Sequence, residues 1–177
     1  MKKFLTLICF IFISFLTFNG NTYALTWEKP YGIKTYIPPQ HKNTLMMKHA
    51  FAEWTRKTNQ KILFKYVSDP AAAQIRVRFV KKINPNFSES DRVIGVTVPL
   101  TANGKYITYS DIYIADFTLD GRTLSKDEVY TTMLHEIGHA LGLNHSNERF
   151  SIMFHIADVR AEISKQDLLN LKTLYKW

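Results

Sequence analysis

The segment TMLHEIGHALGLNHS, residues 132–146, constrains this chain more than any other stretch. It sets His135, Glu136, His139 and His145 among otherwise apolar residues. On an α-helix, residues i and i+4 share a face, so His135 and His139 are expected to point the same way. Two imidazoles in this arrangement can bind one Zn²⁺ ion.

Gly142 comes three residues after His139. A glycine can adopt the left-handed conformation that ends a helix, and the turn would bring His145 back as a third ligand. Three protein ligands leave the fourth position for water, which is typical of catalytic zinc. Glu136 is then predicted to be the general base that acts on this water. The alternative is a buried, histidine-rich helix without metal, but the glycine and the third histidine at fixed offsets argue against a chance match.

The chain begins with two lysines and an apolar run over residues 4–18, followed by small residues up to Ala24. This pattern predicts a signal peptide over residues 1–24, cut after Ala24, and one domain over residues 25–177. We therefore expect a secreted protein, extracellular or periplasmic. The run is shorter than the roughly 18 residues of a spanning helix, so we expect no stable membrane association. An uncleaved membrane anchor is the alternative.

The formal net charge is +8, and the basic residues are scattered rather than clustered. This distribution favours a mildly basic solvated surface, so we expect no nucleic-acid partner and a monomeric protein. The one cysteine, Cys9, lies in the predicted signal peptide. The mature protein is therefore expected to have no disulfide and no thiol nucleophile.

Apolar periodicity predicts an α+β domain. We expect Pro99 to end the fourth strand, a turn at Asn103-Gly104, and a capping box at the start of the second helix. The predicted strands cover residues 33–37, 62–67, 75–80, 92–98 and 112–117, and the predicted helices cover residues 43–58, 125–141 and 164–175.

The motif HEIGHALGLNHS resembles that of the metzincin zinc endopeptidases, and Ser146 directly after the third histidine is the mark of their matrixin branch. The segment SIMF, residues 151–154, resembles the methionine turn of these enzymes and would place Met153 beneath the metal. The flanking segments AFAEWTRKTNQKILF, AQIRVRF and SKQDLLNLKTLY resemble further matrixin elements, with Gln74 and Gln166 where acidic residues are usual and Asp167 at the second acidic position.

This resemblance implies a metzincin-like catalytic domain with a twisted, mostly parallel sheet, an antiparallel edge strand, an active-site helix and a C-terminal helix. It implies one catalytic Zn²⁺ held by the three histidines, with Glu136 as the base that activates the zinc-bound water. The implied substrate is a protein or peptide in extended conformation. Such a substrate would add to the edge strand around Gly95, over residues 93–98.

The chain departs from the family in several ways. We expect no propeptide and no mature cysteine, and therefore no control by a cysteine switch. The sequence has no histidine between Val80 and Met133 that could hold a second zinc ion. Residues 155–157 replace the usual wall of the substrate pocket, so substrate preference does not carry over. Carboxylates are present that could bind Ca²⁺, although solvated turn acids are the alternative. These are Asp111, Asp116 and Asp120.

His155 lies two positions after Met153. One hypothesis is that His155 stabilises the oxyanion or weakly ligates zinc. The alternative is a loop histidine that lines the pocket or faces solvent.

Two rival functions stay open. One is a non-enzymatic zinc-binding module on a degenerate protease fold, against which Glu136 argues. The other is a zinc hydrolase acting on an amide in a cell-wall or small-molecule substrate, against which the edge strand argues.

Overall fold

A five-stranded sheet forms the base of the protein in a computed structural model that describes residues 25–84, 93–102, 106–155 and 158–177. The strand order is β2-β1-β3-β5-β4. Every pair of neighbours is parallel except β5 and β4, which are antiparallel. The predicted mostly parallel sheet with an antiparallel edge strand is confirmed. The strands are β1 (Tyr31–Tyr36), β2 (Leu63–Tyr66), β3 (Ile75–Val80), β4 (Gly95–Ala102) and β5 (Tyr106–Ala115).

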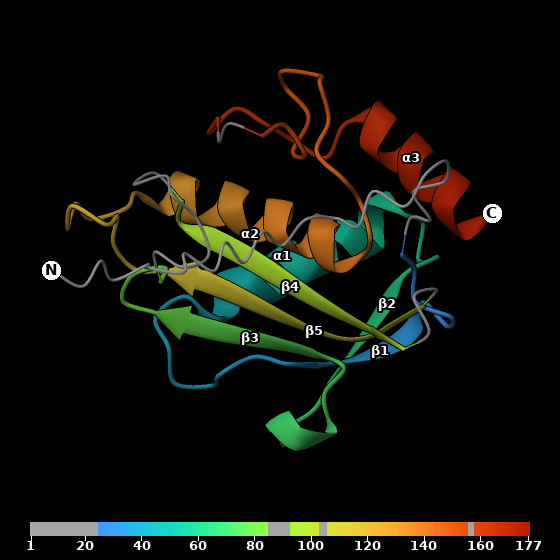
Figure 1. The fold of residues 1–177 in the computed structure, drawn as a ribbon, viewed down its shortest axis with the longest axis horizontal. Coiled ribbons are helices and arrows are strands. Elements are labelled where there is room, and N and C mark those ends of the chain that lie inside the picture. The colour runs from blue at the N-terminus through green and yellow to red at the C-terminus, as the bar shows by residue number, and fades with distance from the viewer. Residues whose placement is uncertain (1–24, 85–92, 103–105, 156–157) are drawn as a thin grey trace, which may run out of the picture.

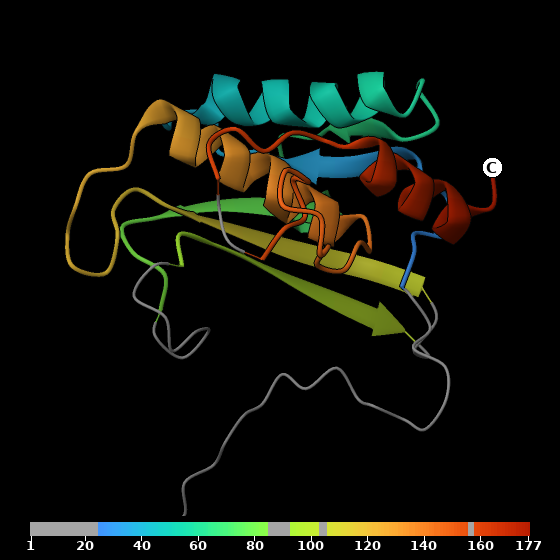
Figure 2. The same ribbon diagram turned by 90° about the horizontal axis from the view of Figure 1, so that it is seen from above.

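Three α-helices lie on one side of this sheet, as Figure 2 shows from above. They are α1 (Thr44–Lys57), α2 (Lys126–Ala140) and α3 (Lys165–Tyr175). A short 3-10 helix, η1 (Pro70–Ala72), precedes β3. Helix α2 runs above β4 and β5, α1 lies behind α2, and α3 lies towards the C-terminal end of α2 (Figure 1).

The core fills the space between the sheet and the helices. The predicted helix α1 is confirmed, and three residues of its predicted apolar face, Ala50, Phe51 and Trp54, are buried. Leu45 and Met46 were also expected on this face, but Leu45 is exposed and Met46 is half-buried, and Met47 lies in the core in their place. The indole of Trp54 also donates a hydrogen bond to the carbonyl of Leu134, 3.0 Å away, and so joins α1 to α2. From the sheet, the core receives mainly isoleucines, which include Ile33, Ile75, Ile112 and Ile114.

The predicted end of β4 was wrong. Pro99 does not end β4 but lies inside it, opposite Ser110. Strand β4 has a neighbour on one side only among the described residues, and at such an edge the missing N–H of proline removes no ladder hydrogen bond. The predicted start at Arg92 and the predicted turn at Asn103-Gly104 lie outside the described residues.

Strand β5 starts at Tyr106, six residues before its predicted start, and ends at Ala115, before Phe117. Its pairing with β4 slips where Leu100 pairs with Tyr109 but Thr101 pairs with Ile107. The slip breaks the alternation of buried and exposed side chains. Because that alternation was the pattern used to predict strands, the first half of β5 was not predicted.

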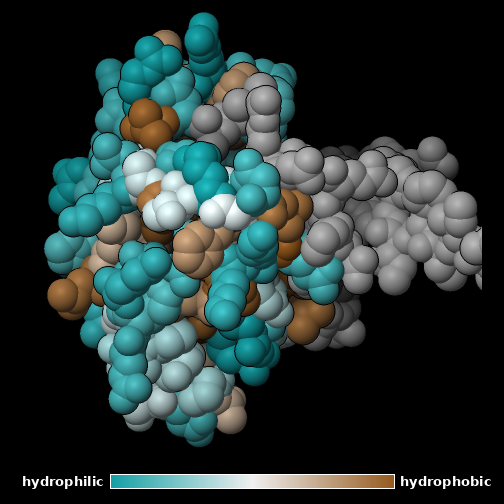
Figure 3. All heavy atoms as spheres, turned by 90° about the vertical axis from the view of Figure 1, so that its left-hand side faces the viewer, coloured by the Kyte–Doolittle hydropathy of each residue, from teal (hydrophilic) through white to brown (hydrophobic). Residues whose placement is uncertain are grey.

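The end of the molecule seen in Figure 3 is covered mostly by hydrophilic residues, with apolar ones scattered among them. None of the helices in the described ranges is both long enough and apolar enough to cross a membrane. The predicted signal peptide, residues 1–24, lies outside the described residues.

Candidate metal centre and active site

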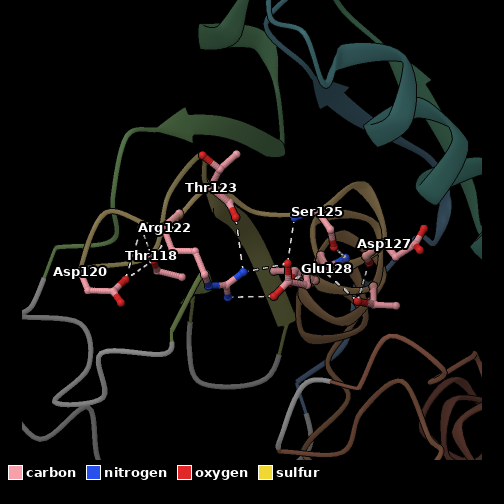
Figure 4. Close-up of polar contacts among 9 residues, drawn as sticks. Thr118, Asp120, Arg122, Thr123, Ser125, Asp127 and Glu128 are labelled. Carbon is pink, nitrogen blue, oxygen red and sulfur yellow. Dashed lines mark hydrogen bonds and ion pairs between the residues drawn. The ribbon is translucent and has the colours of Figure 1, made fainter.

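Helix α2 begins at a well-defined cap. The Ser125 hydroxyl accepts a hydrogen bond from the Glu128 backbone N–H, and the Glu128 carboxylate accepts one from the Ser125 N–H, so the predicted capping box is confirmed. Arg122 donates to both Glu128 oxygens, at 2.9 and 3.1 Å (Figure 4). The Arg122 guanidinium and the cap lower the pKa of Glu128 to about 2, so the carboxylate stays ionised at the positive end of the helix.

The other end of α2 is set by Gly142. Its φ of +93° is the left-handed conformation predicted for it. A Cβ at this position would lie 1.8 Å from the carbonyl oxygen of Leu25, so the N-terminal segment packs directly against the turn. This segment also provides a hydrogen-bond donor for a backbone carbonyl in the last turn of α2, because the Trp27 indole donates to the Ala140 carbonyl at 2.8 Å. The turn carries the chain back to His145.

The three histidines converge as the spacing predicts. The Nε2 atom of His139 lies 3.0 Å from Nε2 of His135 and 3.2 Å from Nε2 of His145. A tetrahedral ion with Zn–N bonds of about 2.0–2.1 Å separates its ligand nitrogens by about 3.3 Å. The donor set and its spacing therefore fit one zinc ion. Within the described ranges, no other group of three or more His, Cys, Asp or Glu side chains converges in this way.

Backbone carbonyls fix the orientation of two of these rings. The Nδ1–H of His135 donates to the carbonyl of Ile152 at 2.6 Å, and the Nδ1–H of His139 donates to that of Leu143 at 2.8 Å. Both Nε2 atoms are then left with free lone pairs, as a metal ligand requires.

Burial lowers the pKa of all three imidazoles, that of His139 to about 3. In His139 the neighbouring His135 adds to this effect. At neutral pH all three rings are therefore neutral and able to bind a metal.

Met153 packs against the middle of α2, at Gly138, which precedes His139. A Cβ on Gly138 would come within 2.3 Å of the Met153 sulfur, so only glycine allows this approach. The Ser146 N–H donates to the Met153 carbonyl at 2.8 Å, which joins the residue after the third histidine to the turn around Met153. The methionine therefore supports both the helix and the loop that carry the histidines.

The turn around Met153 is held in turn by α3. The Ser151 hydroxyl donates to the buried carboxylate of Asp167 at 2.6 Å and accepts from the Met153 N–H at 2.9 Å. Asp167 also caps α3, because it accepts from the Ser164 N–H at 2.9 Å. The Asp167 carboxylate thus joins the start of α3 to the turn that carries Met153.

Glu136 points from α2 towards β4 and is buried, with 5% of its surface exposed. The Thr97 hydroxyl lies 2.7 Å from Oε2 of Glu136 and 2.9 Å from the Glu136 backbone carbonyl. Burial raises the pKa of Glu136 to about 7, and the Thr97 hydrogen bond offsets part of that rise. A carboxylate with a pKa near neutrality is suited to take up and release a proton.

Thr97 was not among the predicted site residues. The sequence held one weak indication of its role. Thr97 and Gly95 are alternate residues of one predicted strand, so Thr97 must face the same side of the sheet as the predicted site residue Gly95. Gly95 itself lies against α2, where a Cβ would come within 2.8 Å of the Glu136 side chain.

The structure does not bring His155 into the histidine cluster. His155 is exposed, its ring lies 4.5 Å from that of Phe154, and its charge acts to lower the pKa of His145. Its predicted role in the reaction stays a hypothesis. Residues 156 and 157, which were expected to replace the pocket wall, lie outside the described residues.

The three aspartates considered for calcium lie apart from the histidine cluster and are bonded to protein donors. Asp111 accepts hydrogen bonds from two arginines and from Tyr109, and Asp116 pairs with Lys42 and His41. Asp120 accepts hydrogen bonds from the Thr118 hydroxyl and the Arg122 N–H.

A helix and the turn after it carry a histidine triad, and hydrogen bonds join this segment to the turn around Met153. The helix lies beside the antiparallel edge of a mostly parallel sheet. This arrangement defines a metzincin catalytic domain. The chain belongs to the matrixin family, whose model matches residues 21–176.

Individual relatives are distant. The chain is 26% identical over 153 residues to metalloendoproteinase 1-MMP of Arabidopsis thaliana, a match that covers 85% of this chain and 40% of the relative. It is 26% identical over 158 residues to the macrophage metalloelastase of Oryctolagus cuniculus, covering 84% and 33% of the two chains. It is 22% identical over 169 residues to karilysin of Tannerella forsythia, covering 92% and 32%. The chain thus spans less than half the length of these curated relatives.

Proposed function

We propose that this protein is a secreted, zinc-dependent endopeptidase that cleaves extended segments of protein or peptide substrates. The observation that carries the proposal is the convergence of three imidazole Nε2 atoms within 4.8 Å of one another, with a buried carboxylate on the next residue after the first histidine. Membership of the matrixin family supports the same activity.

His135, His139 and His145 would hold the zinc ion. When bound, the ion supplies a Lewis acid that polarises a substrate carbonyl and makes water acidic enough to lose a proton near neutral pH. The two Nδ1 hydrogen bonds keep the rings in place, so the protein does not need to reorganise when it takes up the metal. We include no calcium ion in the proposal.

Glu136 would act as the general base. It takes a proton from the attacking water and passes that proton to the leaving amine nitrogen as the peptide bond breaks. Its burial and its pKa of about 7 support this role, because the group can exist in both protonation states near neutral pH.

The substrate would bind along β4. This strand pairs with β5 on one side and, among the described residues, has no strand on its other side. An extended peptide can add to such an edge through main-chain hydrogen bonds. Strand β4 includes Gly95, Thr97 and Val98, and two of these, Gly95 and Thr97, also contact Glu136 of α2. The bound substrate would therefore lie on one edge of a strand that packs against α2.

His155 would stabilise the developing oxyanion in this scheme, which its exposed position near His145 permits. The His155→Ala variant should then lower turnover by roughly tenfold with zinc content unchanged. Unchanged turnover would leave His155 as a loop histidine.

Residues 1–24 would be a signal peptide and residues 25–177 the catalytic domain. The packing of Leu25 against the Gly142 turn supports a domain boundary close to this residue. Mass spectrometry of the exported protein tests the cut, which is expected between Ala24 and Leu25.

The proposed activity is tested by incubating the purified protein with unstructured protein substrates, with a chelator and with zinc added back. We expect fragments from internal cleavage that disappear with the chelator and return with zinc. One bound zinc without cleavage would favour a zinc-binding module, and cleavage of amides only in cell-wall fragments or small molecules would favour the other rival hydrolase.

A further inference from the structure

Strand β4 meets α2 through two alternate residues, Gly95 and Thr97. In the antiparallel register Gly95 lies opposite Ile114 and Thr97 opposite Ile112, both of which are buried in the core. Because opposite residues of an antiparallel pair face the same side, Gly95 and Thr97 face the helices. Their common neighbour on α2 is Glu136.

The Thr97 hydroxyl contacts both the side-chain carboxylate and the backbone carbonyl of Glu136. It lies 2.7 Å from carboxylate oxygen Oε2 and 2.9 Å from the backbone carbonyl of the same residue. Since a hydroxyl carries one proton, it donates to one of these oxygens at a time. Within the described part of the chain, this hydroxyl is the hydrogen-bond donor that reaches the buried carboxylate.

Gly95 contacts the other side of the same carboxyl group. A Cβ on this residue would lie 2.8 Å from Oε1 and 2.8 Å from Cγ of Glu136, and 2.5 Å from the methyl carbon of Thr132. The absence of a side chain therefore lets the strand approach the helix at Oε1. Oε2 accepts the hydrogen bond from the Thr97 hydroxyl, whereas Oε1 lies beside Gly95.

We propose that Thr97 is a positioning residue for the reaction, which holds Oε2 of Glu136 so that Oε1, beside Gly95, is the oxygen that receives the proton of the attacking water. The inference rests on the proposed function. A carboxylate held at one oxygen keeps a single side-chain rotamer, and small misplacements of a reacting group cost large factors in rate.

The first test compares kcat and KM of Thr97→Val and Thr97→Ser. Valine keeps the shape and suits a strand but removes the hydroxyl, so kcat should fall roughly tenfold while KM changes less than about twofold. Serine keeps the hydroxyl and should restore most of kcat. Thr108→Val is the matched control, because that threonine is exposed on β5 and its hydroxyl donates to the Leu100 carbonyl rather than to Glu136, and kcat of this variant should stay unchanged.

A second readout does not depend on activity. In the zinc-free protein, Thr97→Val should lower the folding equilibrium constant roughly tenfold when Glu136 is present. In the Glu136→Ala background, which keeps the backbone carbonyl, the same change should cost less than about threefold. This difference isolates the bond between the two side chains.

Equal losses in both backgrounds, or an unchanged kcat in Thr97→Val, would overturn the role of Thr97 while the proposed peptidase activity stands. A wild-type protein that binds zinc and cleaves no peptide would overturn the proposed function and this inference together.

Discussion

The imidazole of His135 donates from Nδ1 to the carbonyl of Ile152, 2.6 Å away, and so joins the first histidine of α2 to the turn that carries Met153. His135 and Ile152 are 17 positions apart in the chain. Their hydrogen bond fixes the tautomer and the orientation of the His135 ring, a candidate zinc ligand. The second histidine is fixed in the same manner by Leu143. Both rings are oriented by backbone groups, which no side-chain substitution removes directly.

We expect one zinc ion to bind per chain and to raise the melting temperature. His139→Ala should weaken zinc binding by roughly a hundredfold or more, because it removes a ligand rather than a group that orients one. The affinity is measured by competition with a chromophoric chelator. His49→Ala, at an exposed position on α1, is the control and should bind zinc like the wild type. Equal binding by both variants would exclude the histidine triad as the zinc site.

Gly138→Ala should destabilise the protein, although alanine normally stabilises a helix relative to glycine by up to about 1 kcal/mol. The reason is that the new Cβ would meet the sulfur of Met153. Overpacking of this kind costs about 1–3 kcal/mol, which urea denaturation measures.

Met153→Ala in the same chain should make the Gly138→Ala substitution less costly, since the clashing group is gone. A stabilising effect of Gly138→Ala in the wild-type background would contradict the close packing of Met153 beneath α2.

Asp167→Ala should lower the free energy of unfolding by about 2–4 kcal/mol. The substitution leaves the buried Ser151 hydroxyl and the Ser164 N–H without their acceptor. Because Ser151 also holds the Met153 N–H, zinc affinity should fall as well. The neighbouring Gln166 is exposed, so Gln166→Ala should change neither quantity, and similar losses in both variants would refute the specific role of Asp167.

The zinc-free protein should show a pH dependence set by Glu136. Its pKa is raised from 4.5 to about 7 in the folded state, so between these values the folded protein holds more protons than the unfolded chain. Stability from this group is therefore complete below about pH 4.5 and is lost as the pH rises through about 7. Relative to Glu136→Gln, the wild type should lose on the order of 3 kcal/mol over this range.

Urea denaturation at a series of pH values measures this difference directly. The histidines act in the opposite direction, because their lowered pKa makes the fold lose stability as the pH falls below about 6.5. The Glu136→Gln variant keeps that contribution, so the comparison cancels it. A flat difference between pH 4.5 and 7 would contradict the raised pKa that burial gives to the Glu136 carboxyl group.

The histidine cluster was predictable because its geometry is local. The i, i+4 spacing of His135 and His139 and the left-handed Gly142 are properties of one short segment, and the structure brings His145 to the other two rings as that segment predicts. The helix α1 and the burial of Ala50, Phe51 and Trp54 followed from its periodicity for the same reason, although Leu45 is exposed.

Contacts between segments distant in sequence could not be predicted in the same manner. Thr97 and Glu136 are 39 residues apart, and only the packing of β4 against α2 brings them together. The first half of β5 was missed because a slip in its pairing breaks the alternation of side chains, and Pro99 was misjudged because its strand lies at an edge. Each of these depends on which elements are neighbours, and a single sequence gives little information about that.

The most direct test of the central claim is the rate at which the purified, zinc-loaded Glu136→Ala variant cleaves an unstructured protein, compared with the wild type. Zinc content is determined on the same samples. We predict one zinc per chain in both proteins, chelator-sensitive cleavage by the wild type, and a loss of roughly a hundredfold or more in the variant. Cleavage by the Glu136→Ala variant at the wild-type rate, with zinc bound in both, would contradict the account.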